Sequence, residues 1–308
     1  MILVYIALFA GQFDATFREG LIALNQNNLA VAESKLESAT QLEPHNGRAW
    51  VALAQTYWKE HKAAQARSAA QSADAWAGDD AIARNALKLF YSEDYYFQIA
   101  QLDLNRQNFA VALETLDTGR KKFSNSAQLE LAAGVAYYGL RRFPEAIDAF
   151  LRTIQLDGTI EQPYVFLGRM LDQAERKLPA VTQAFAGFAA RAPDSYLSNF
   201  LYGKALAVAD DTGAAEASLR KSIAQNGGYW ESRFELGLLL ERRQKFDDAA
   251  RELKTSADLN PRDPVIHYHL ARVYDRLGKT AEAQAERELH ARLAAESAPA
   301  GYGMTGIK

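Results

Sequence analysis

The sequence repeats itself at intervals of 34 residues, and this periodicity limits the fold more than any other feature. In eight successive stretches a small residue is followed, twelve residues later, by an alanine. The small residues are Gly20, Ala54, Ala100, Gly134, Gly168, Gly203, Gly237 and Ala271. The alanines are Ala32, Ala66, Ala112, Ala146, Ala180, Ala215, Ala249 and Ala283. Such regularity predicts a row of small modules, in place of one or two globular domains with a central core.

The repeated units account for nearly all of the 308 residues. They span 13–46, 47–80, 93–126, 127–160, 161–195, 196–229, 230–263 and 264–297, the fifth being one residue longer than the others. We therefore expect repeats 1–2 over 13–80, a helical insertion at 81–92, repeats 3–8 over 93–297 and a flexible tail at 298–308. An apolar leader, 1–12, precedes them. Little room remains for a separate catalytic domain.

Each unit is predicted to form two helices joined by a short turn. In the fourth unit they are expected over about 127–139 and 144–156, because Pro144 suits the first turn of a helix. The chain contains 56 alanines, and alanine combines the best helix propensity with a small side chain. We expect the marked small residues to let paired helices approach closely, while large residues fill the space beside them. Examples of these large residues are Leu36, Leu116, Phe150, Leu219 and Leu253.

The pattern resembles the tetratricopeptide repeat, in which an aromatic residue, Leu-Gly, Tyr, Ala, Phe, Ala and Pro recur at fixed offsets. The second unit has Trp50, Leu53, Ala54, Tyr57, Ala66, Ala73 and Gly78 at those offsets. The seventh has Leu236, Gly237, Ala249, Leu253 and Pro261. The resemblance implies an all-α fold, namely an α-solenoid of about eight helix-turn-helix repeats. It also implies a right-handed superhelix whose concave face is lined by the first helix of each repeat.

Two segments outside the repeats leave alternatives open. The apolar run 2–10 is too short to span a membrane, which takes about 20 residues. It fits either the hydrophobic region of a signal peptide or a buried first helix. In the first case the protein is periplasmic or extracellular, and in the second it is cytoplasmic. Segment 81–92 has helical periodicity, and is either a hinge or docking element or a decayed half-repeat.

The residues needed for several kinds of chemistry are missing from the sequence. The absence of cysteine excludes thiol catalysis, cysteine-ligated zinc and iron–sulfur clusters. A formal net charge of -3 gives no general field for nucleic acid. His267 and His269 lie two positions apart and do not share a helix face, so we interpret them as surface histidines. We expect no catalytic residue, no metal, no cofactor and no enzymatic activity.

The resemblance also indicates where a ligand would bind. In this family, ligands usually contact positions 2, 5, 9, 12 and 13 of the first helix of a repeat. Position 5 is apolar throughout, which fits either packing between repeats or an apolar floor for a peptide. Basic residues at position 9 cluster in the C-terminal half, and together with Arg242 and Arg276 they favour an acidic partner segment. The candidate groove residues are Gln55, Phe97, Gln101, Arg169, Phe200, Lys204, Phe234, Tyr268 and Arg272.

These expectations favour a non-catalytic scaffold that binds a partner protein or peptide in the concave groove and helps to assemble a larger complex. The alternative is a regulatory or accessory subunit of an enzyme, or of a cell-envelope or secretion system. The polar last repeat argues against end-to-end self-association, so we expect a monomer or one subunit of a hetero-complex. Phe17 and Leu21 replace the Lys–Asn pair with which some family members clamp a C-terminal carboxylate, and we do not expect that activity.

Overall fold

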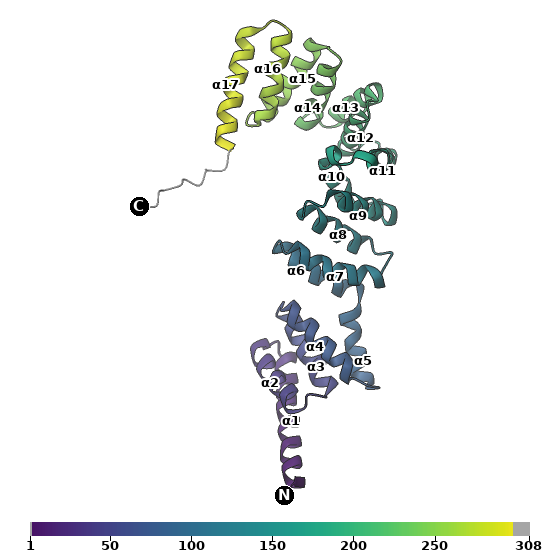
Figure 1. The fold of residues 1–308 in the computed structure, drawn as a ribbon, viewed down its shortest axis with the longest axis vertical. Coiled ribbons are helices and arrows are strands. Elements are labelled where there is room, and N and C mark those ends of the chain that lie inside the picture. Colours follow the sequence, from purple (N-terminus) through teal and green to yellow (C-terminus); the bar gives the residue numbers. More distant parts are fainter. Residues whose placement is uncertain (1, 298–308) are drawn as a thin grey trace, which may run out of the picture. The chain divides into compact units, whose positions relative to one another are not determined.

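The computed structural model describes residues 2–297, and this part of the chain contains seventeen α-helices and no strand (Figure 1). The tail predicted to be flexible, 298–308, lies outside the described residues. The chain divides into two compact units at Leu156 and Asp157, which we call the N-terminal and C-terminal units. Each holds four of the expected repeats. None of the described helices combines the length and apolar character that a membrane span needs.

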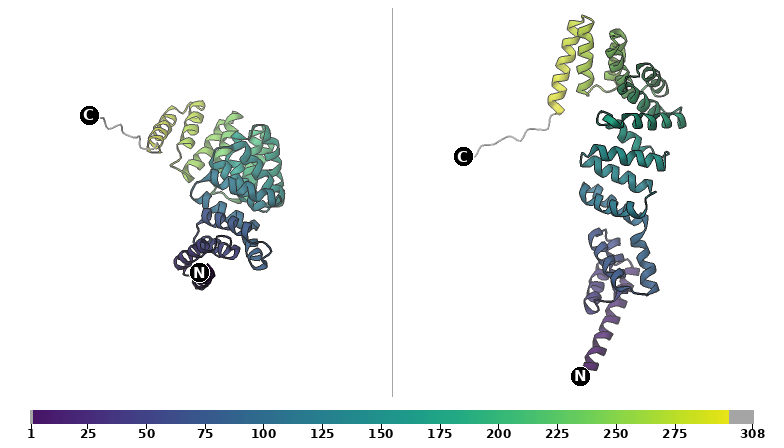
Figure 2. Two further views of the ribbon diagram at one scale, coloured as in Figure 1. Left: turned by 60° about the horizontal axis from the view of Figure 1, so that its bottom comes forward. Right: turned by 45° about the vertical axis from the view of Figure 1, so that its right-hand side comes forward.

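The helices come in pairs that match the eight predicted repeats, and the two helices of a pair lie against each other (Figure 2). In the N-terminal unit the pairs are α1 (Ile2–Asn25) with α2 (Leu29–Leu42), α3 (Gly47–Lys59) with α4 (Ala63–Trp76), α6 (Glu93–Asn105) with α7 (Phe109–Lys122), and α8 (Ala127–Gly139) with α9 (Phe143–Leu156). In the C-terminal unit they are α10 (Gln162–Arg169) with α11 (Leu178–Arg191), α12 (Tyr196–Val208) with α13 (Thr212–Gln225), α14 (Trp230–Arg242) with α15 (Phe246–Leu259), and α16 (Pro264–Arg276) with α17 (Thr280–Ser297). The fold is an α-solenoid.

The packing within a pair confirms the role of the small residues. A Cβ atom on Gly134 would come within 2.6 Å of the Phe150 ring, and one on Gly237 within 2.6 Å of Leu253. Phe150 and Leu253 are completely buried. The first helix of a pair therefore lacks a side chain at the point where the second helix inserts a large one, and this complementarity fixes the register of the two helices.

The turn between paired helices has the same geometry in seven of the eight repeats, although its sequence varies. The fifteenth residue of each unit adopts a positive φ: Asn27, His61, Gln107, Arg141, Glu175, Asp210, Gln244 and Gly278. In seven of these turns φ lies between 57° and 72°, and a backbone bond closes the turn, such as Lys245 N–H to Leu240 O at 3.0 Å. This is the Schellman arrangement, which glycine suits best. Seven of the eight positions hold another residue and bear its conformational strain.

The fifth repeat departs from the predicted register. We expected Ala180 to occupy the second small position, but Ala180 is exposed, whereas Val181 and Phe185 are fully buried. The first helix, α10, ends early and is followed by two 3₁₀ helices, η2 (Leu171–Gln173) and η3 (Glu175–Lys177). The extra residue of this unit therefore lies in the turn before α11, and it shifts every buried position of that helix by one.

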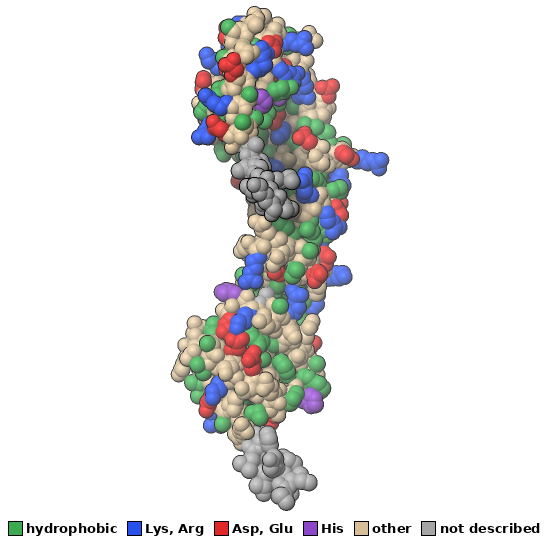
Figure 3. All heavy atoms as spheres, turned by 60° about the vertical axis from the view of Figure 1, so that its left-hand side comes forward, with side chains coloured by type: hydrophobic (Ala, Val, Ile, Leu, Met, Phe, Trp, Pro, Cys, Tyr) green, Lys and Arg blue, Asp and Glu red, His purple; other side chains and the backbone are tan. Residues whose placement is uncertain are grey.

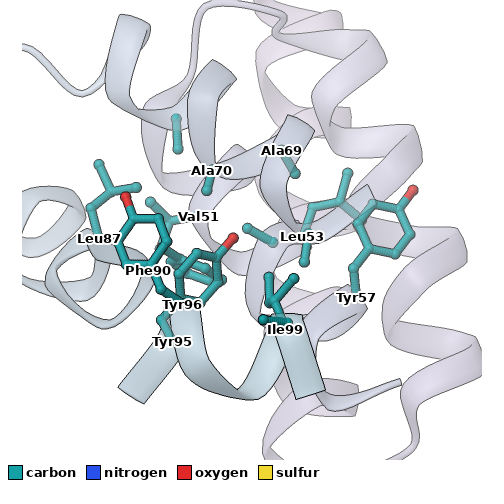
Figure 4. Packing of buried hydrophobic residues seen from close by; sticks show 14 of the residues in the cluster. Val51, Leu53, Tyr57, Ala69, Ala70, Leu87, Phe90, Tyr95, Tyr96 and Ile99 are labelled. Carbon is teal, nitrogen blue, oxygen red and sulfur yellow. The ribbon is translucent and has the colours of Figure 1, made fainter. Parts of the chain in front are cut away.

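The insertion forms a short helix, α5 (Ala81–Leu87), followed by a 3₁₀ helix, η1 (Lys88–Tyr91). Elsewhere in the N-terminal unit the second helix of a repeat packs on the first helix of the next, as α7 packs on α8. Between repeats 2 and 3, α5 packs on α3 and α4, and η1 packs on α6. Leu87 and Phe90 are buried in one hydrophobic cluster with residues of the flanking repeats (Figure 4). The insertion thus contributes to the core of this unit.

Candidate functional site

The first helices of repeats 6, 7 and 8 line a hollow in the C-terminal unit, which we call the C-terminal cavity. Its volume is about 590 Å³. The lining residues come from α12, α14, α15 and α16 and from one turn: Ala207, Val208, Glu235, Leu238, Glu241, Arg242, Gln244, Phe246, His269, Arg272 and Arg276. Three arginines and two glutamates thus line it together with apolar residues such as Leu238 and Phe246. Lys and Arg side chains gather on the C-terminal repeats, at the top of Figure 3.

Some of the basic residues in and beside the cavity form ion pairs with carboxylates of a neighbouring repeat. Arg272 contacts Glu241 at 3.1 Å, and His269 lies 3.2 Å from the same carboxylate. Lys204 contacts Glu235 at 3.2 Å. The basic residues at position 9 were predicted to await an acidic partner, yet Lys204 and Arg272 already have carboxylates in the next or preceding repeat. Because these pairs are partly exposed, each contributes little to stability, but together they fix the alignment of three repeats.

Arg242 and Arg276 differ from these residues. Both are exposed at the rim of the C-terminal cavity, and neither forms an ion pair with any residue that the structure describes. They occupy position 13 of α14 and α16. The uncompensated positive charge of the cavity is therefore carried by this pair of arginines, which are not among the predicted groove residues.

The aromatic residues at position 5 divide between packing and exposure. Phe200 is buried against the ring of Tyr229, at 5.1 Å between centroids. Phe234 packs edge-to-face on His269 at 5.7 Å. The Phe234 contact joins repeats 7 and 8, whereas Tyr229 is the last residue of repeat 6. Tyr268 is 45% exposed, and the Arg272 guanidinium lies over its ring at 5.6 Å. Of the three, Tyr268 is the one that offers an aromatic surface to a ligand.

The other predicted residues are not assembled into one site. Gln55 faces the insertion across a shallow hollow lined by residues of α5. Gln101 lines a different hollow of about 320 Å³ beside Trp58. Phe97 is half-buried and packs against the N-terminal core. Arg169 is exposed at the end of α10.

One buried carboxylate lies near this part of the C-terminal unit. Glu231 occupies position 2 of α14, and its Oε2 is buried without a hydrogen-bond partner among the described residues. Loss of solvent raises the pKa of Glu231, and the charge of Lys204 partly opposes this shift. Burial likewise raises the pKa of the adjacent Tyr229 well above its usual range, and the charge of Arg169 opposes it.

The histidines do not form a metal site in the described part of the chain, where no group of three or more potential ligands occurs. His267 was interpreted as a surface residue, but it is 3% exposed. Its Nδ1 lies 2.6 Å from Glu286 Oε2, and its Nε2 lies 3.0 Å from the carbonyl oxygen of Pro261. Both ring nitrogens are therefore engaged in tying α16 to α17 and to the loop before it.

Sequence reasoning missed several residues of the C-terminal cavity. Glu241 occupies position 12 of α14, one of the positions at which the family contacts ligands, so its offset alone could have identified it. Glu235 and His269 lie at position 6, which carried no such expectation. Their role follows from three-dimensional pairing between repeats, and the repeat pattern does not encode that pairing.

Comparison with known proteins agrees with the observed architecture. Models of the tetratricopeptide repeat match residues 23–89, 97–159 and 240–298, which together exceed half of the chain. No curated protein matches the sequence. The crystal structure of PilW, a type IV pilus biogenesis factor, is similar with a TM-score of 0.53 and 19% identity, over 66% of this chain and 92% of that one. At this identity the similarity concerns the fold alone.

Two further solved structures are similar at lower scores. YrrB, a tetratricopeptide repeat protein with an unusual peptide-binding site, gives a TM-score of 0.41 at 15% identity, over 70% of this chain and 94% of that one. TTC0263, a thermophilic tetratricopeptide repeat protein in Thermus thermophilus, gives 0.45 at 21% identity, over 55% and 98%. The repeat models, the paired helices and the glycine-to-large-residue packing agree with one another, and the chain belongs to the tetratricopeptide repeat family.

Proposed function

We propose that this protein is a non-catalytic scaffold whose C-terminal cavity holds a segment of a partner protein during assembly of a larger complex. Its fold is of the kind that mediates protein–protein interaction. The single observation that carries the specific site is the pair Arg242 and Arg276, two exposed arginines that line the C-terminal cavity and form no ion pair with a described residue.

The residues that line the cavity indicate what kind of partner segment would bind there. Carboxylates would pair with the two free arginines, and arginine binds carboxylates well because its planar guanidinium can donate two parallel hydrogen bonds. An apolar side chain between the carboxylates would cover Leu238 and Phe246, which line the cavity. Tyr268 adds an exposed ring at its edge. The preferred partner segment is therefore acidic with an apolar centre.

Peptide binding to the full chain tests this proposal. A fluorescent peptide with two acidic clusters around a leucine should raise its anisotropy on binding, with an affinity that falls as salt increases. The double change Arg242→Glu and Arg276→Glu should weaken binding about a hundredfold, because two charge-assisted contacts become repulsive. The matched control, Arg18→Glu with Arg106→Glu, changes the net charge equally at exposed sites of the N-terminal unit. An equal loss of peptide affinity in the two variants would show that the effect comes from net charge alone, and it would refute the site.

The cellular location of the protein is a second part of the proposal. We propose that the protein is exported, which would place its partner in the cell envelope or outside the cell. The support is the apolar run 2–10, which has the length and character of a signal-peptide core. Sequencing the N-terminus of the protein purified from its natural host tests this directly. A mature chain that begins near residue 11 is expected, and a chain that retains Ile2 would contradict export.

A further inference from the structure

A second cavity lies in the N-terminal unit, where the insertion meets repeats 2 and 3, and we call it the Tyr95 pocket. Its volume is about 190 Å³. It is lined by Arg67, Ala70 and Gln71 of α4, Phe90 and Tyr91 of η1, Tyr95 and Tyr96 of α6, and Thr115 and Thr118 of α7. Two of its four walls, α4 and α7, are the second helices of their repeats. It is therefore a different site from the cavity formed by first helices in the C-terminal unit.

The Tyr95 hydroxyl is the unusual group of this pocket. Tyr95 is 4% exposed, and its buried Oη has no hydrogen-bond partner among the described residues. A buried hydroxyl without a partner costs free energy, so native proteins seldom retain one without a reason. Burial raises the pKa of Tyr95 to about 12. At physiological pH the phenol therefore keeps its proton, so a residue that lines the pocket carries an unused hydrogen-bond donor.

Arg67 is the one charged side chain among the described residues that line the pocket. The Arg67 guanidinium donates to Thr115 Oγ1, and it forms no ion pair within the part of the chain that the structure describes. Lys122 Nζ lies over the Tyr91 ring at 4.5 Å and over the Tyr96 ring at 5.4 Å. Asp74, whose charge acts on Tyr91, contacts Arg84 at 2.6 Å. A half-buried arginine without a carboxylate thus lines the same small space as an unpaired donor.

The walls hold these donors in place. Phe90 and Tyr95 pack edge-to-face at 5.4 Å, as do Tyr95 and Tyr96 at 5.5 Å, and the three rings lie together in Figure 4. Ser92 caps α6 by accepting a hydrogen bond from Tyr95 N at 3.2 Å, which fixes the start of that helix. A water molecule takes about 30 Å³ of liquid volume, so the space holds roughly six waters or one small organic acid.

We propose that the Tyr95 pocket binds a small carboxylate, which pairs with the Arg67 guanidinium and accepts a hydrogen bond from the Tyr95 hydroxyl. The carbon portion of the ligand lies on the rings of Phe90 and Tyr96. The insertion creates this site, because Phe90 and Tyr91 form one wall and separate α4 from α6. The shared chemistry is the carboxylate group, carried either by a free small acid or by an acidic side chain of a protein.

Calorimetric titration of the full chain tests the proposal with three acids: benzoate, glutarate and N-acetylglutamate amidated at its α-carboxyl. Benzamide, which has the size of benzoate without its charge, is the neutral control. At least one acid should bind with a single-site isotherm, and benzamide should not. Tighter binding of the capped glutamate would indicate a protein side chain as the natural ligand, and tighter binding of benzoate or glutarate would indicate a free acid. Failure of all three acids to bind below about 10 mM, or equal binding of benzamide, would overturn the proposal.

Two tyrosine variants separate ligand binding from folding. Tyr95→Phe removes a hydroxyl that has no partner, so it should weaken the acid about tenfold to a hundredfold while leaving the melting temperature unchanged or higher. Tyr57→Phe is the matched control, because the Tyr57 hydroxyl contacts Glu37 Oε1 at 2.6 Å outside the pocket. It should lower the melting temperature and leave the affinity unchanged. An affinity for the acid that Tyr95→Phe does not alter would contradict the assigned contact.

Two arginine variants test whether the charge of Arg67 holds the carboxylate. Arg67→Gln should abolish measurable binding, since the ion pair supplies most of the attraction in a partly enclosed site. Arg106→Gln removes an exposed arginine of the same unit that lies outside the pocket, and it should bind the acid like the wild type. Binding that survives Arg67→Gln would show that the carboxylate is not held there.

Discussion

Repeats 6–8 and the junction of repeats 2 and 3 use the same helical pairs in different ways. In repeats 6–8, α13 packs directly on α14 and α15 on α16, and ion pairs such as Lys204 with Glu235 join neighbouring first helices. At the junction, η1 and α5 lie between α4 and α6, aromatic rings contribute to the core, and the ion pair of Arg84 with Asp74 joins α5 to α4. The 34-residue pattern sets the helical pair. The residues outside the pattern determine which kind of surface a junction presents.

The largest expected effect is a loss of stability on removing a buried ring, and it tests whether the insertion belongs to the hydrophobic core as the repeats do. Phe90→Ala in η1 and Phe150→Ala in α9 remove rings that are 1% and 0% exposed. Each should lower the free energy of unfolding by about 3–5 kcal/mol, measured by urea denaturation. A much smaller loss for Phe90→Ala would favour the hinge interpretation of 81–92. Hydrogen exchange gives an independent check, since protection of 81–92 should equal that of α3 and α6.

The shifted register of repeat 5 gives the next largest contrast. Val181→Ala should lower the free energy of unfolding by about 2 kcal/mol, because it leaves a space at a completely buried position. Ala180→Ser alters an exposed side chain and should change stability by less than about 0.5 kcal/mol. Equal sensitivity at the two positions would show that the fifth repeat keeps the twelve-residue spacing of the others.

Substitution by glycine at the strained turns should stabilise the protein, in contrast to the substitutions in the core. Gln244 has φ 60°, and Gly278 holds the equivalent position of the last repeat with φ 72°. Gln244→Gly should raise the free energy of unfolding by about 0.5–1 kcal/mol, as relief of the left-handed conformation exceeds the entropy cost of glycine. Gly278→Gln should lower it by a similar amount. Urea denaturation of both variants measures these changes. If the variant or wild-type protein with glycine at the turn is not the more stable one in either comparison, the shared turn geometry would be contradicted.

The smallest effect concerns pH. Because burial raises the pKa of Glu231 in the folded chain, the ionised carboxylate destabilises the fold above that pKa. Glu231→Gln should therefore stabilise the protein at neutral pH. The gain should shrink as pH falls through the folded pKa, and vanish below the unfolded value of about 4.3. Thermal melts between neutral pH and pH 4 measure this. A gain that is constant over that range would show that the charge of Glu231 is not responsible.

The sequence predicted the helical pairs well because their positions depend on a local period that repeats eight times. Gly134 opposite Phe150 follows from spacing alone. Repeat 5 was misregistered because one extra residue in a turn cannot be placed until the burial of Val181 is seen. The candidate site was only partly predicted. Arg272 does line the C-terminal cavity, but its partner Glu241 lies 31 positions earlier in the chain, and no local pattern joins them.

The most direct test of the scaffold proposal is site-specific photo-crosslinking in cells. A benzoylphenylalanine at Tyr268, beside the C-terminal cavity, should capture one partner protein, and the yield should fall when Arg242→Glu and Arg276→Glu are present. The control position is Leu259, which is 42% exposed in the same unit but at the end of a second helix, α15. It should capture little. Equal capture at both positions, or capture that is insensitive to the two arginines, would contradict binding in this cavity.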